Sequence, residues 1–250
     1  MMQKAILPED APLDALVHET APEILVAVAA DQRLTEDLAL ALLNRRDLPR
    51  EALEELHKHK SLAKLRKIQL AIVMHQHTPR HVSVPAIRHL YAFELMQVAL
   101  LPAVPADVKR AAEEVLISRM SSISSGEKST LAKRSSGRVA ASLLTEKEER
   151  IMQAALSNPQ MTEISIVRAL KAEAGTELLA PAVARHTKWS YRNDIKLALI
   201  ANKNTPLASI VRFAAELPLN SIRDLLRNAR LSPTARAGIL SAMDRRGKGV

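Results

Sequence analysis

The sequence contains no cysteine, and only 6 of its 250 residues are glycine. The absence of cysteine excludes a disulfide framework, a thiolate nucleophile and a zinc or iron–sulfur site with cysteine ligands. With so few glycines, the chain also has little from which to build a glycine-rich phosphate-binding loop. Several classes of enzyme are therefore excluded before any motif is considered.

Long apolar runs and a secretory signal are also missing. No stretch approaches the ~18 uncharged apolar residues that cross a membrane. The first 20 residues hold Glu9, Asp10, Asp14 and Glu19, where a signal would have basic residues followed by an apolar segment. Since 47% of the residues are apolar and 25% are charged, as in ordinary globular proteins, we expect a soluble, cytoplasmic protein that contacts no membrane.

Charge is unevenly distributed along the chain. Residues 1–60 carry 7 lysines and arginines against 12 acidic residues, whereas residues 186–250 carry 12 against 4. The formal net charge is +9, and no acidic residue occurs between Glu55 and Glu94. A field of one sign keeps a protein soluble and also concentrates oppositely charged ligands. The basic parts therefore indicate an acidic partner.

Apolar residues recur with the period of an α-helix, and strand-like alternation is nearly absent. Leu62, Leu65, Ile68 and Ile72 lie three or four residues apart, which places them on one face of a helix. We predict one helix over Leu62–Met74, with two of its sides covered by other helices.

Two pairs of residues have the S/T-x-x-E spacing of a capping box, Thr20 with Glu23 and Thr145 with Glu148. In such a box a side chain and the backbone satisfy each other's free hydrogen-bond donors at the start of a helix. Each pair precedes an apolar-periodic segment, so we predict a helix start at each.

Prolines punctuate the helical segments. Pro49, Pro79, Pro206 and Pro233 each follow an apolar segment and a polar turn, where the first residue of the next helix is expected. Pro49 and Pro79 are 30 residues apart and Pro206 and Pro233 are 27 apart, which is the length of a helix–turn–helix unit. Because a lone helical hairpin cannot cover its own apolar face, this recurrence predicts stacked hairpins.

Residues 194–206 read DIKLALIANKNTP. This segment resembles the repeat of HEAT-like and leucine-rich-repeat-variant proteins, with an acidic residue, a basic residue, small apolar residues and then Asn-x-x-Thr-Pro. The resemblance extends over residues 30–80 and 126–243, whereas the segment Leu90–Val104 departs from it. It implies an all-α, right-handed solenoid of stacked helical hairpins with roughly 12 to 16 short helices. The usual task of such a solenoid is binding, and no catalytic residue carries over.

A serine-rich segment separates the two halves of the chain, and its composition is typical of an exposed connection. The predicted parts are an N-terminal helical-repeat lobe over residues 1–120, a connection over 121–126, a C-terminal helical-repeat lobe over 127–244 and a frayed basic tail over 245–250.

Six of the eight histidines lie between His57 and His89. They invite a metal hypothesis, but His57 and His59 are two residues apart, as are His75 and His77, and such pairs point away from each other on a helix. A transition-metal site would also recruit a carboxylate or a thiolate, which this span lacks. We favour solvated turn histidines that add positive charge when protonated, and we expect no metal and no other cofactor.

Three segments resemble catalytic motifs only superficially. Residues 124–130 lack the first glycine of a phosphate-binding loop. The adjacent carboxylates of Glu113 and Glu114, and of Glu148 and Glu149, diverge by about 100° on a helix and rarely converge on one substrate. A surface serine loop and solvated helix faces are the better interpretations, and we expect the protein not to be an enzyme.

Aromatic residues make up only 2% of the chain, yet Trp189 and Tyr191 lie together among three cations. Bases stack on such rings while cations hold phosphates, as in single-stranded nucleic-acid binding. The alternative, which we favour, is that both rings pack against a neighbouring repeat. Farther along the chain, Arg223 and Arg227 are four residues apart and share a helix face.

We favour a non-enzymatic scaffold whose concave, partly basic helical surface binds an acidic protein or peptide. A nucleic-acid-binding protein is the first alternative, and a DNA-glycosylase-like enzyme on the same scaffold is the second. The residues predicted to contact a partner are Lys58, Lys60, Lys64, Arg66, Lys67, Arg80, Arg88, Lys188, Trp189, Tyr191, Arg192, Arg223, Arg227 and Arg230.

Overall fold

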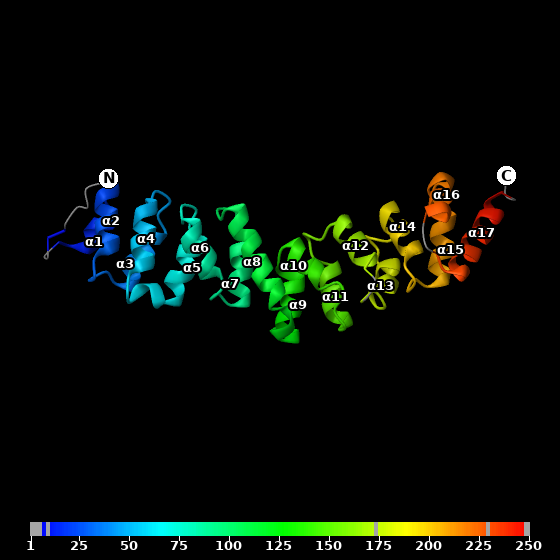
Figure 1. The fold of residues 1–250 in the computed structure, drawn as a ribbon, viewed down its shortest axis with the longest axis horizontal. Helices are drawn as coiled ribbons and strands as arrows, with labels where there is room; N and C mark the ends of the chain where they lie inside the picture. Colours follow the sequence, from blue (N-terminus) through cyan, green and yellow to red (C-terminus); the bar gives the residue numbers. More distant parts are fainter. Residues whose placement is uncertain (1–6, 9–10, 173–174, 229–230, 248–250) are drawn as a thin grey trace. The chain divides into compact units, whose positions relative to one another are not determined.

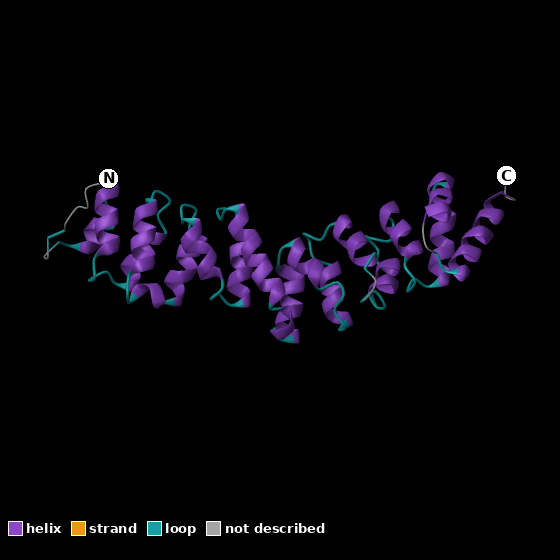
Figure 2. Ribbon diagram, in the orientation of Figure 1, coloured by secondary structure: helices purple, strands orange, loops and turns teal. Residues whose placement is uncertain are grey.

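The computed structural model describes residues 7–8, 11–172, 175–228 and 231–247. In this part of the chain, α-helices and two 3-10 helices are joined by turns, and no β-strand occurs (Figure 2). The prediction of an all-α fold is therefore confirmed. The described residues form 17 α-helices, slightly more than expected, because short segments such as α1 and α10 are separate helices.

Two compact units divide the chain, residues 1–121 and residues 122–250, and we call them unit 1 and unit 2 (Figure 1). Unit 1 holds α1 (Leu13–Leu16), α2 (Pro22–Ala30), α3 (Glu36–Leu43), α4 (Arg50–Lys58), η1 (Leu62–Lys64), α5 (Arg66–Met74), α6 (Arg80–Ile87), α7 (Ala92–Leu100) and α8 (Ala106–Ser118). The short helix η2 (Met120–Ser122) spans the division. Unit 2 holds α9 (Ser125–Arg134), α10 (Gly137–Ser142), α11 (Glu149–Leu156), α12 (Glu163–Leu170), α13 (Leu179–Arg185), α14 (Asn193–Ala201), α15 (Leu207–Glu216), α16 (Leu219–Asn228) and α17 (Pro233–Gly247).

Helices within each unit pack mainly on those next to them and on those two places away. In unit 1 the pairs two places apart are α2 with α4, α3 with α5, α5 with α7, and α6 with α8. In unit 2 they are α9 with α11, α11 with α13, α10 with α12, α12 with α14, α14 with α16, and α15 with α17. Each helix therefore buries its apolar face against helices that are close in sequence.

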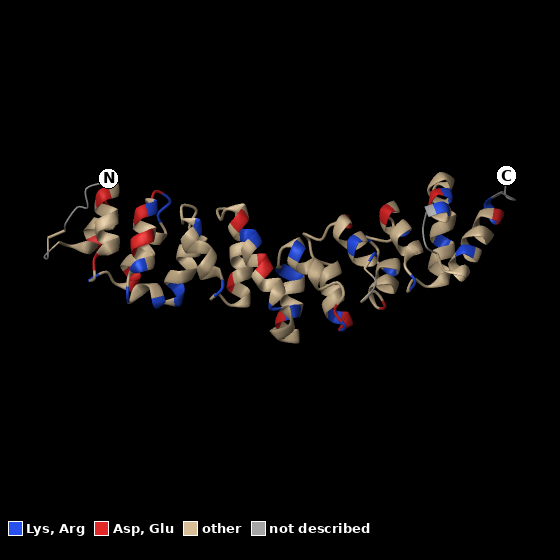
Figure 3. Ribbon diagram, viewed as in Figure 1, with Lys and Arg blue, Asp and Glu red and all other residues tan. Residues whose placement is uncertain are grey.

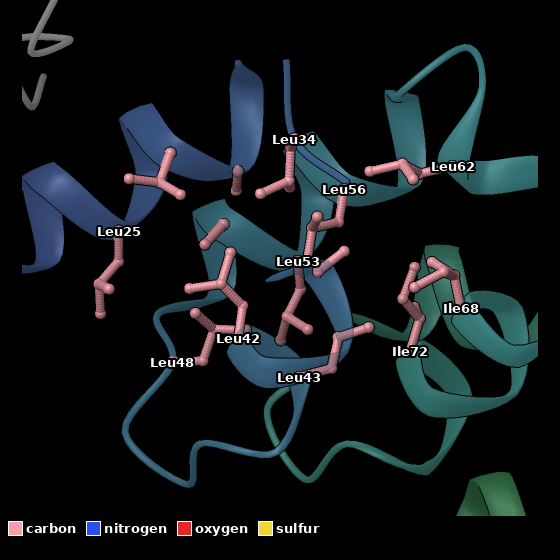
Figure 4. Packing of buried hydrophobic residues seen from close by; sticks show 14 of the residues in the cluster. Leu25, Leu34, Leu42, Leu43, Leu48, Leu53, Leu56, Leu62, Ile68 and Ile72 are labelled. Carbon is pink, nitrogen blue, oxygen red and sulfur yellow. The ribbon is translucent and has the colours of Figure 1, made fainter. Parts of the chain in front are cut away.

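Leucine and isoleucine fill the core of unit 1. Leu25 of α2, Leu42 of α3, Leu53 and Leu56 of α4 and Ile68 of α5 belong to one buried cluster (Figure 4). All five are almost fully buried. Leu53 and Leu56 lie three residues apart on one face of α4, and each of the four helices contributes at least one of these side chains to the same core.

The turns explain why the chain needs so few glycines. Among the described residues no residue other than glycine has a positive φ, and Gly175 is the only glycine that does. Most helices end instead at residues with extended or right-handed backbone angles, such as His75 after α5 and Asn202 after α14. Ordinary side chains adopt these angles without strain, which leaves the turn positions free for polar residues.

Many of these turn residues tie one helix to the helix two places before it. A side chain of one helix, or of the turn after it, donates a hydrogen bond to a backbone carbonyl 23 to 33 residues earlier. The donors include Arg45, His59, His75, Gln76, His77, Arg119, Asn158, Trp189, Asn202, Arg212 and Arg246. Carbonyls at the ends of helices lack a partner within their own helix, so these bonds stabilise the packing between helices. We call them the carbonyl tethers.

Two predicted capping boxes are wrong. The helix after Thr20 begins at Pro22, with Ala21 as its N-cap, because proline is well suited to the first helical position. Thr145 lies in a turn, and α11 begins only at Glu149. A capping box is instead formed by Ser124 and Glu127 at the start of α9, within the segment that superficially resembles a phosphate-binding loop.

The prediction of a single helix over Leu62–Met74 is also wrong. The segment is divided into η1 and α5 by Leu65, whose backbone is extended. The imidazole Nδ1 of His59 accepts the Leu62 amide at 3.3 Å, which holds this stretch as a turn. The prolines lie close to their predicted places, since Pro49, Pro79 and Pro206 come directly before the first helical residue and Pro233 is the first residue of α17.

The predicted connection and tail are more ordered than expected. The division between the units lies beside Ser121, but η2 covers residues 120–122 and α9 begins at Ser125. In the predicted frayed tail, Arg246 lies in α17 and donates to the carbonyl of Leu217 at 2.7 Å, so this part of the tail is held by a tether. Residues 248–250 lie outside the described part of the chain.

No helix in the described residues has the length and apolar character needed to cross a membrane.

Candidate functional site

A cavity of about 570 Å³ lies in unit 1. It is formed by the end of α3, by α5 and by the turn after α7. We call it the α5 groove. Its lining residues are Leu43, Asn44, Arg45, Arg46, Lys67, Leu70, Ala71, Met74, His75, Gln76, Leu101 and Ala103.

The floor of the α5 groove is apolar. Leu70, Ala71 and Met74 come from α5, Leu101 comes from the turn after α7, and all four are only half-buried. They therefore keep apolar area exposed to water that an apolar ligand would cover. A volume of this size lies within the range of ordinary ligand sites, roughly 300 to 1,000 Å³.

The rim of the α5 groove is cationic, but its three cations differ. Arg45 pairs with Asp47, with Nη2 and Oδ2 2.7 Å apart, and also donates to the carbonyl of Val17. Lys67 lies 3.7 Å from a carboxylate oxygen of Glu36 and is otherwise well exposed. The side chain of Arg46 is exposed and has no ion pair or hydrogen bond with another described residue. Arg46 is thus the cation that is most available to an acidic ligand.

Carbonyl tethers hold the turn that carries Arg46. His75 Nε2 donates to the carbonyl of Arg45 at 2.8 Å, and Gln76 Nε2 donates to the carbonyl of Arg46 at 3.0 Å. His77 Nδ1 donates to the carbonyl of Leu48 at 3.1 Å. These bonds fix the backbone on both sides of the arginine, so little ordering of the turn is needed when a ligand binds.

The tether from His75 requires a neutral imidazole. Nε2 donates to a carbonyl, while Nδ1 accepts the amide of His77 at 3.2 Å, so no nitrogen is free for a second proton. Burial lowers the pKa of His75 below its ordinary value of about 6.5, and the ring of His77 adds to the shift, while the bond to the Arg45 carbonyl opposes it. At neutral pH the histidine is therefore uncharged.

We expect the stability of unit 1 to fall as the pH drops below about 6.5. Between that value and the lowered pKa of the folded protein, unfolded His75 binds a proton and folded His75 does not, which favours unfolding. The variant His75→Asn should lose this part of the pH dependence, because an amide can make both bonds without titrating. Urea unfolding from about pH 7 to about pH 5 checks it, with His89→Asn as an exposed control. If the free energy of unfolding depended on pH with the same slope in the wild type and in His75→Asn, the neutral state assigned to the imidazole of His75 would be contradicted.

The other sequence-predicted cations of unit 1 are not gathered at one site. Lys58 pairs with Glu55, and Arg80 pairs with Asp107. Acidic and basic positions occur together along α4 and along α8 (Figure 3). Although residues 56–93 hold no acid, Glu55 lies one helical turn before Lys58 in α4, and the packing of α6 on α8 brings Asp107 to Arg80. Lys60, Lys64 and Arg88 are exposed and have no acidic partner among the described residues. The linear charge pattern therefore overstates the free positive charge.

Arg66 is occupied by partners inside unit 1. Its guanidinium binds both carboxylate oxygens of Glu94, with Nε to Oε1 at 2.7 Å, and lies 3.0 Å from the centre of the Tyr91 ring. The pKa of Glu94 lies below its ordinary value, since the bonds to Arg66 and to the Tyr91 amide outweigh the opposing effect of burial. A residue engaged in this way positions α5 against α7 and is not available to an acidic partner.

Of the six histidines in this span, His59, His75, His77 and His89 lie in turns, as predicted, whereas His57 lies in α4 and His81 in α6. Two of the turn histidines are not solvated. His59 and His75 are buried, with 3% and 7% of their surface exposed, and both act as carbonyl tethers. The prediction of solvated histidines is wrong for these two because the turn packs against the preceding turn. Among the described residues, no three histidine, aspartate or glutamate side chains come close enough to form a metal site.

The aromatic segment of unit 2 divides into a buried and an exposed ring. Trp189 is only 3% exposed, and its indole Nε1 donates to the carbonyl of Leu156 at 2.9 Å. The ammonium of Lys188 lies 4.2 Å from the centre of the ring. Packing is therefore the role that the burial of Trp189 supports. Tyr191 is 75% exposed, so the preference for packing of both rings is wrong for this one.

The remaining predicted cations of unit 2 lie on its surface. Arg192 is exposed as the N-cap of α14, and Arg223 and Arg227 are exposed on α16, with Asp224 beside them. Arg230 lies outside the described residues.

No protein-family model, curated protein or solved structure matches this chain. The site is therefore interpreted from its own residues.

A smaller cavity in unit 2, of about 380 Å³, has no uniform charge. Its lining includes Glu163 and Asp194 as well as Lys171, around apolar residues of α12 and α14. By contrast, the α5 groove is lined by three cations and no acid. This difference in sign makes the α5 groove the better candidate for a charged ligand.

Asn44, Arg46 and Met74 were not predicted as site residues. The polar turn after α3 was recognised as a turn, but no spacing rule connects it with α5 or with Leu101. A useful signal was present in the pair Arg45–Arg46 directly after an apolar helix. Only the packing of α3 on α5 shows which apolar surface these arginines border.

Proposed function

We propose that this protein is a non-enzymatic binding scaffold for an acidic protein or peptide. In this proposal each unit is a right-handed stack of HEAT-like helical hairpins, and unit 1 presents the α5 groove to the partner. The observation that carries the proposal is the unpaired Arg46 beside an apolar floor. An arginine at the edge of apolar surface binds carboxylates through charge-assisted hydrogen bonds.

Two further features support a binding scaffold. The packing of each helix on its neighbours and on those two places away is what a stack of hairpins requires. The carbonyl tethers make the turns rigid, and rigid surfaces lose little entropy on binding.

Nucleic acid is the less favoured ligand. Trp189, the residue best suited to base stacking, is buried and its N–H is engaged. Lys58, Arg66, Lys67 and Arg80 have acidic partners that would compete with phosphates. The proposal therefore commits to a protein or peptide, and nucleic-acid binding is an outcome of its test.

The test is to titrate the full chain into fluorescein-labelled probes and to measure anisotropy at low and at higher salt. The probes are an acidic peptide, a basic peptide of matched length, a DNA duplex and a single-stranded RNA. We expect saturable binding of the acidic peptide that weakens as salt rises, and no comparable binding of the basic peptide.

Two results would overturn the proposal. One is the absence of saturable binding of acidic peptides at low salt. The other is tighter binding of the nucleic acids, with a steep salt dependence that Lys60→Glu and Lys64→Glu reduce. These two lysines are chosen because they are exposed and have no acidic partner in the described residues, so that their reversal breaks no ion pair.

A further inference from the structure

The residues around Arg46 offer three kinds of contact. Asn44 is exposed, and its side-chain amide makes no hydrogen bond with another described residue. Arg46 presents an unpaired cation two residues later. Leu70, Met74 and Leu101 supply the apolar floor of the same cavity.

Each kind of contact has a matching ligand group. A side-chain amide has both donors and an acceptor, and so pairs with the N–H and C=O of a peptide backbone. A guanidinium pairs with a carboxylate in a bidentate manner. Half-buried leucine and methionine side chains accept apolar side chains, and methionine adapts to several shapes.

From this combination we infer that the α5 groove binds an extended peptide segment in which an acidic residue neighbours aliphatic residues. Asn44 holds the peptide backbone, Arg46 takes the acidic side chain, and the floor covers an aliphatic side chain. This inference rests on the proposed function and names the chemistry of its partner.

The charge around the groove favours such a segment over a purely acidic one. Asp47 and Glu36 partly neutralise Arg45 and Lys67, which leaves Arg46 as the single unpaired cation. One strong carboxylate contact is therefore available, and the rest of the affinity must come from the apolar floor. A free amphiphilic acid satisfies Arg46 and the floor but leaves Asn44 unused, so the amide favours a peptide.

The test compares three labelled peptides on the full chain. One alternates glutamate with leucine, the second has serine in place of every leucine, and the third has lysine in place of every glutamate. We expect the first to bind at least about tenfold more tightly than the other two, because each of them lacks one of the two required contacts.

Three variants locate the site. Arg46→Glu should weaken binding of the glutamate–leucine peptide about tenfold or more, and Met74→Gln should weaken it several-fold. Arg134→Glu makes the same charge change on an exposed residue of α9 in unit 2 and should leave binding unchanged. Circular dichroism checks that all three variants remain folded.

A second measurement does not depend on affinity changes. In protein with ¹³C-labelled methionine methyl groups, the Met74 signal is identified by its loss in Met74→Gln. We expect it to shift when the glutamate–leucine peptide is added, while the signal of Met152, buried in unit 2, does not.

The inference is overturned if the serine peptide binds as tightly as the leucine peptide, or if dodecanoate displaces the peptide with equal affinity. It is also overturned if acidic peptides bind but neither Arg46→Glu nor Met74→Gln weakens them; in that case the protein still binds acidic peptides, but at a surface other than the α5 groove. Failure of every acidic peptide to bind overturns both.

Discussion

The variant Trp189→Ala is expected to destabilise unit 2 by about 3 to 5 kcal/mol. The indole is 3% exposed and donates to the carbonyl of Leu156, so its removal leaves a cavity and an unsatisfied carbonyl at the end of α11. Because Trp189 is the only tryptophan, unfolding is followed by circular dichroism and by hydrogen exchange of α13 and α14 rather than by fluorescence.

Two neighbouring variants make this prediction specific. Trp189→Phe keeps most of the apolar volume but loses the N–H, and it should cost about 1 to 2 kcal/mol. Tyr191→Ala removes a ring that is 75% exposed and should change stability by less than about 0.5 kcal/mol. If Trp189→Ala had the same free energy of unfolding as the wild type, the indole would not be a packing residue, and the hypothesis that it contacts a ligand would be favoured instead.

The variant Asn202→Ala is expected to destabilise the same unit by about 2 to 4 kcal/mol. The side chain of Asn202 donates to the carbonyl of Leu170 at 2.6 Å and accepts the amide of Asn204 at 2.8 Å. Alanine leaves both backbone groups without a partner in a buried turn, and each unsatisfied group costs about 1 to 3 kcal/mol. Urea unfolding monitored by circular dichroism measures the loss.

An exposed asparagine provides the control. Asn193 is the first residue of α14 and lies at the surface, so Asn193→Ala should have an effect within about 0.5 kcal/mol. An Asn202→Ala variant as stable as Asn193→Ala would show that the tether contributes nothing to the packing of α14 on α12.

Four tethers use the same arrangement with different side chains. Asn158 donates to the carbonyls of Ala132 and Ser135 and accepts the amide of Gln160, in the same manner as Asn202. His59 and His75 donate through Nε2 to a carbonyl of an earlier turn and accept a local amide at Nδ1. The histidine imidazoles of unit 1 thus make the same pair of hydrogen bonds as the asparagine amides of unit 2: each donates to a carbonyl of an earlier turn and accepts a local backbone amide. His75 and Asn202 each stand three residues before the threonine of a Thr-Pro pair, Thr78-Pro79 and Thr205-Pro206, but only the structure shows that the imidazole and the amide make the same two bonds.

The sequence by itself determined the helical character of the protein. Spacings of three and four residues among leucine, isoleucine and valine, together with prolines at the turns, specify local structure, and local structure depends on residues that are near in the chain. The scarcity of glycine also agreed with the turns of the described residues, which need no left-handed backbone except at Gly175.

Only the tertiary structure decided which polar side chains bond to other parts of the protein and which remain available to a ligand. Lys64 and Arg66 appeared equivalent in a span without acids, yet a bidentate carboxylate from α7 occupies Arg66, whereas Lys64 is exposed and has no acidic partner among the described residues. Arg46 was not predicted as a site residue, yet its unpaired guanidinium lies beside the apolar floor of the α5 groove. The reason is physical: ion pairs, tethers and cavities join residues about 30 positions apart, and their energies depend on distances that chain order does not encode.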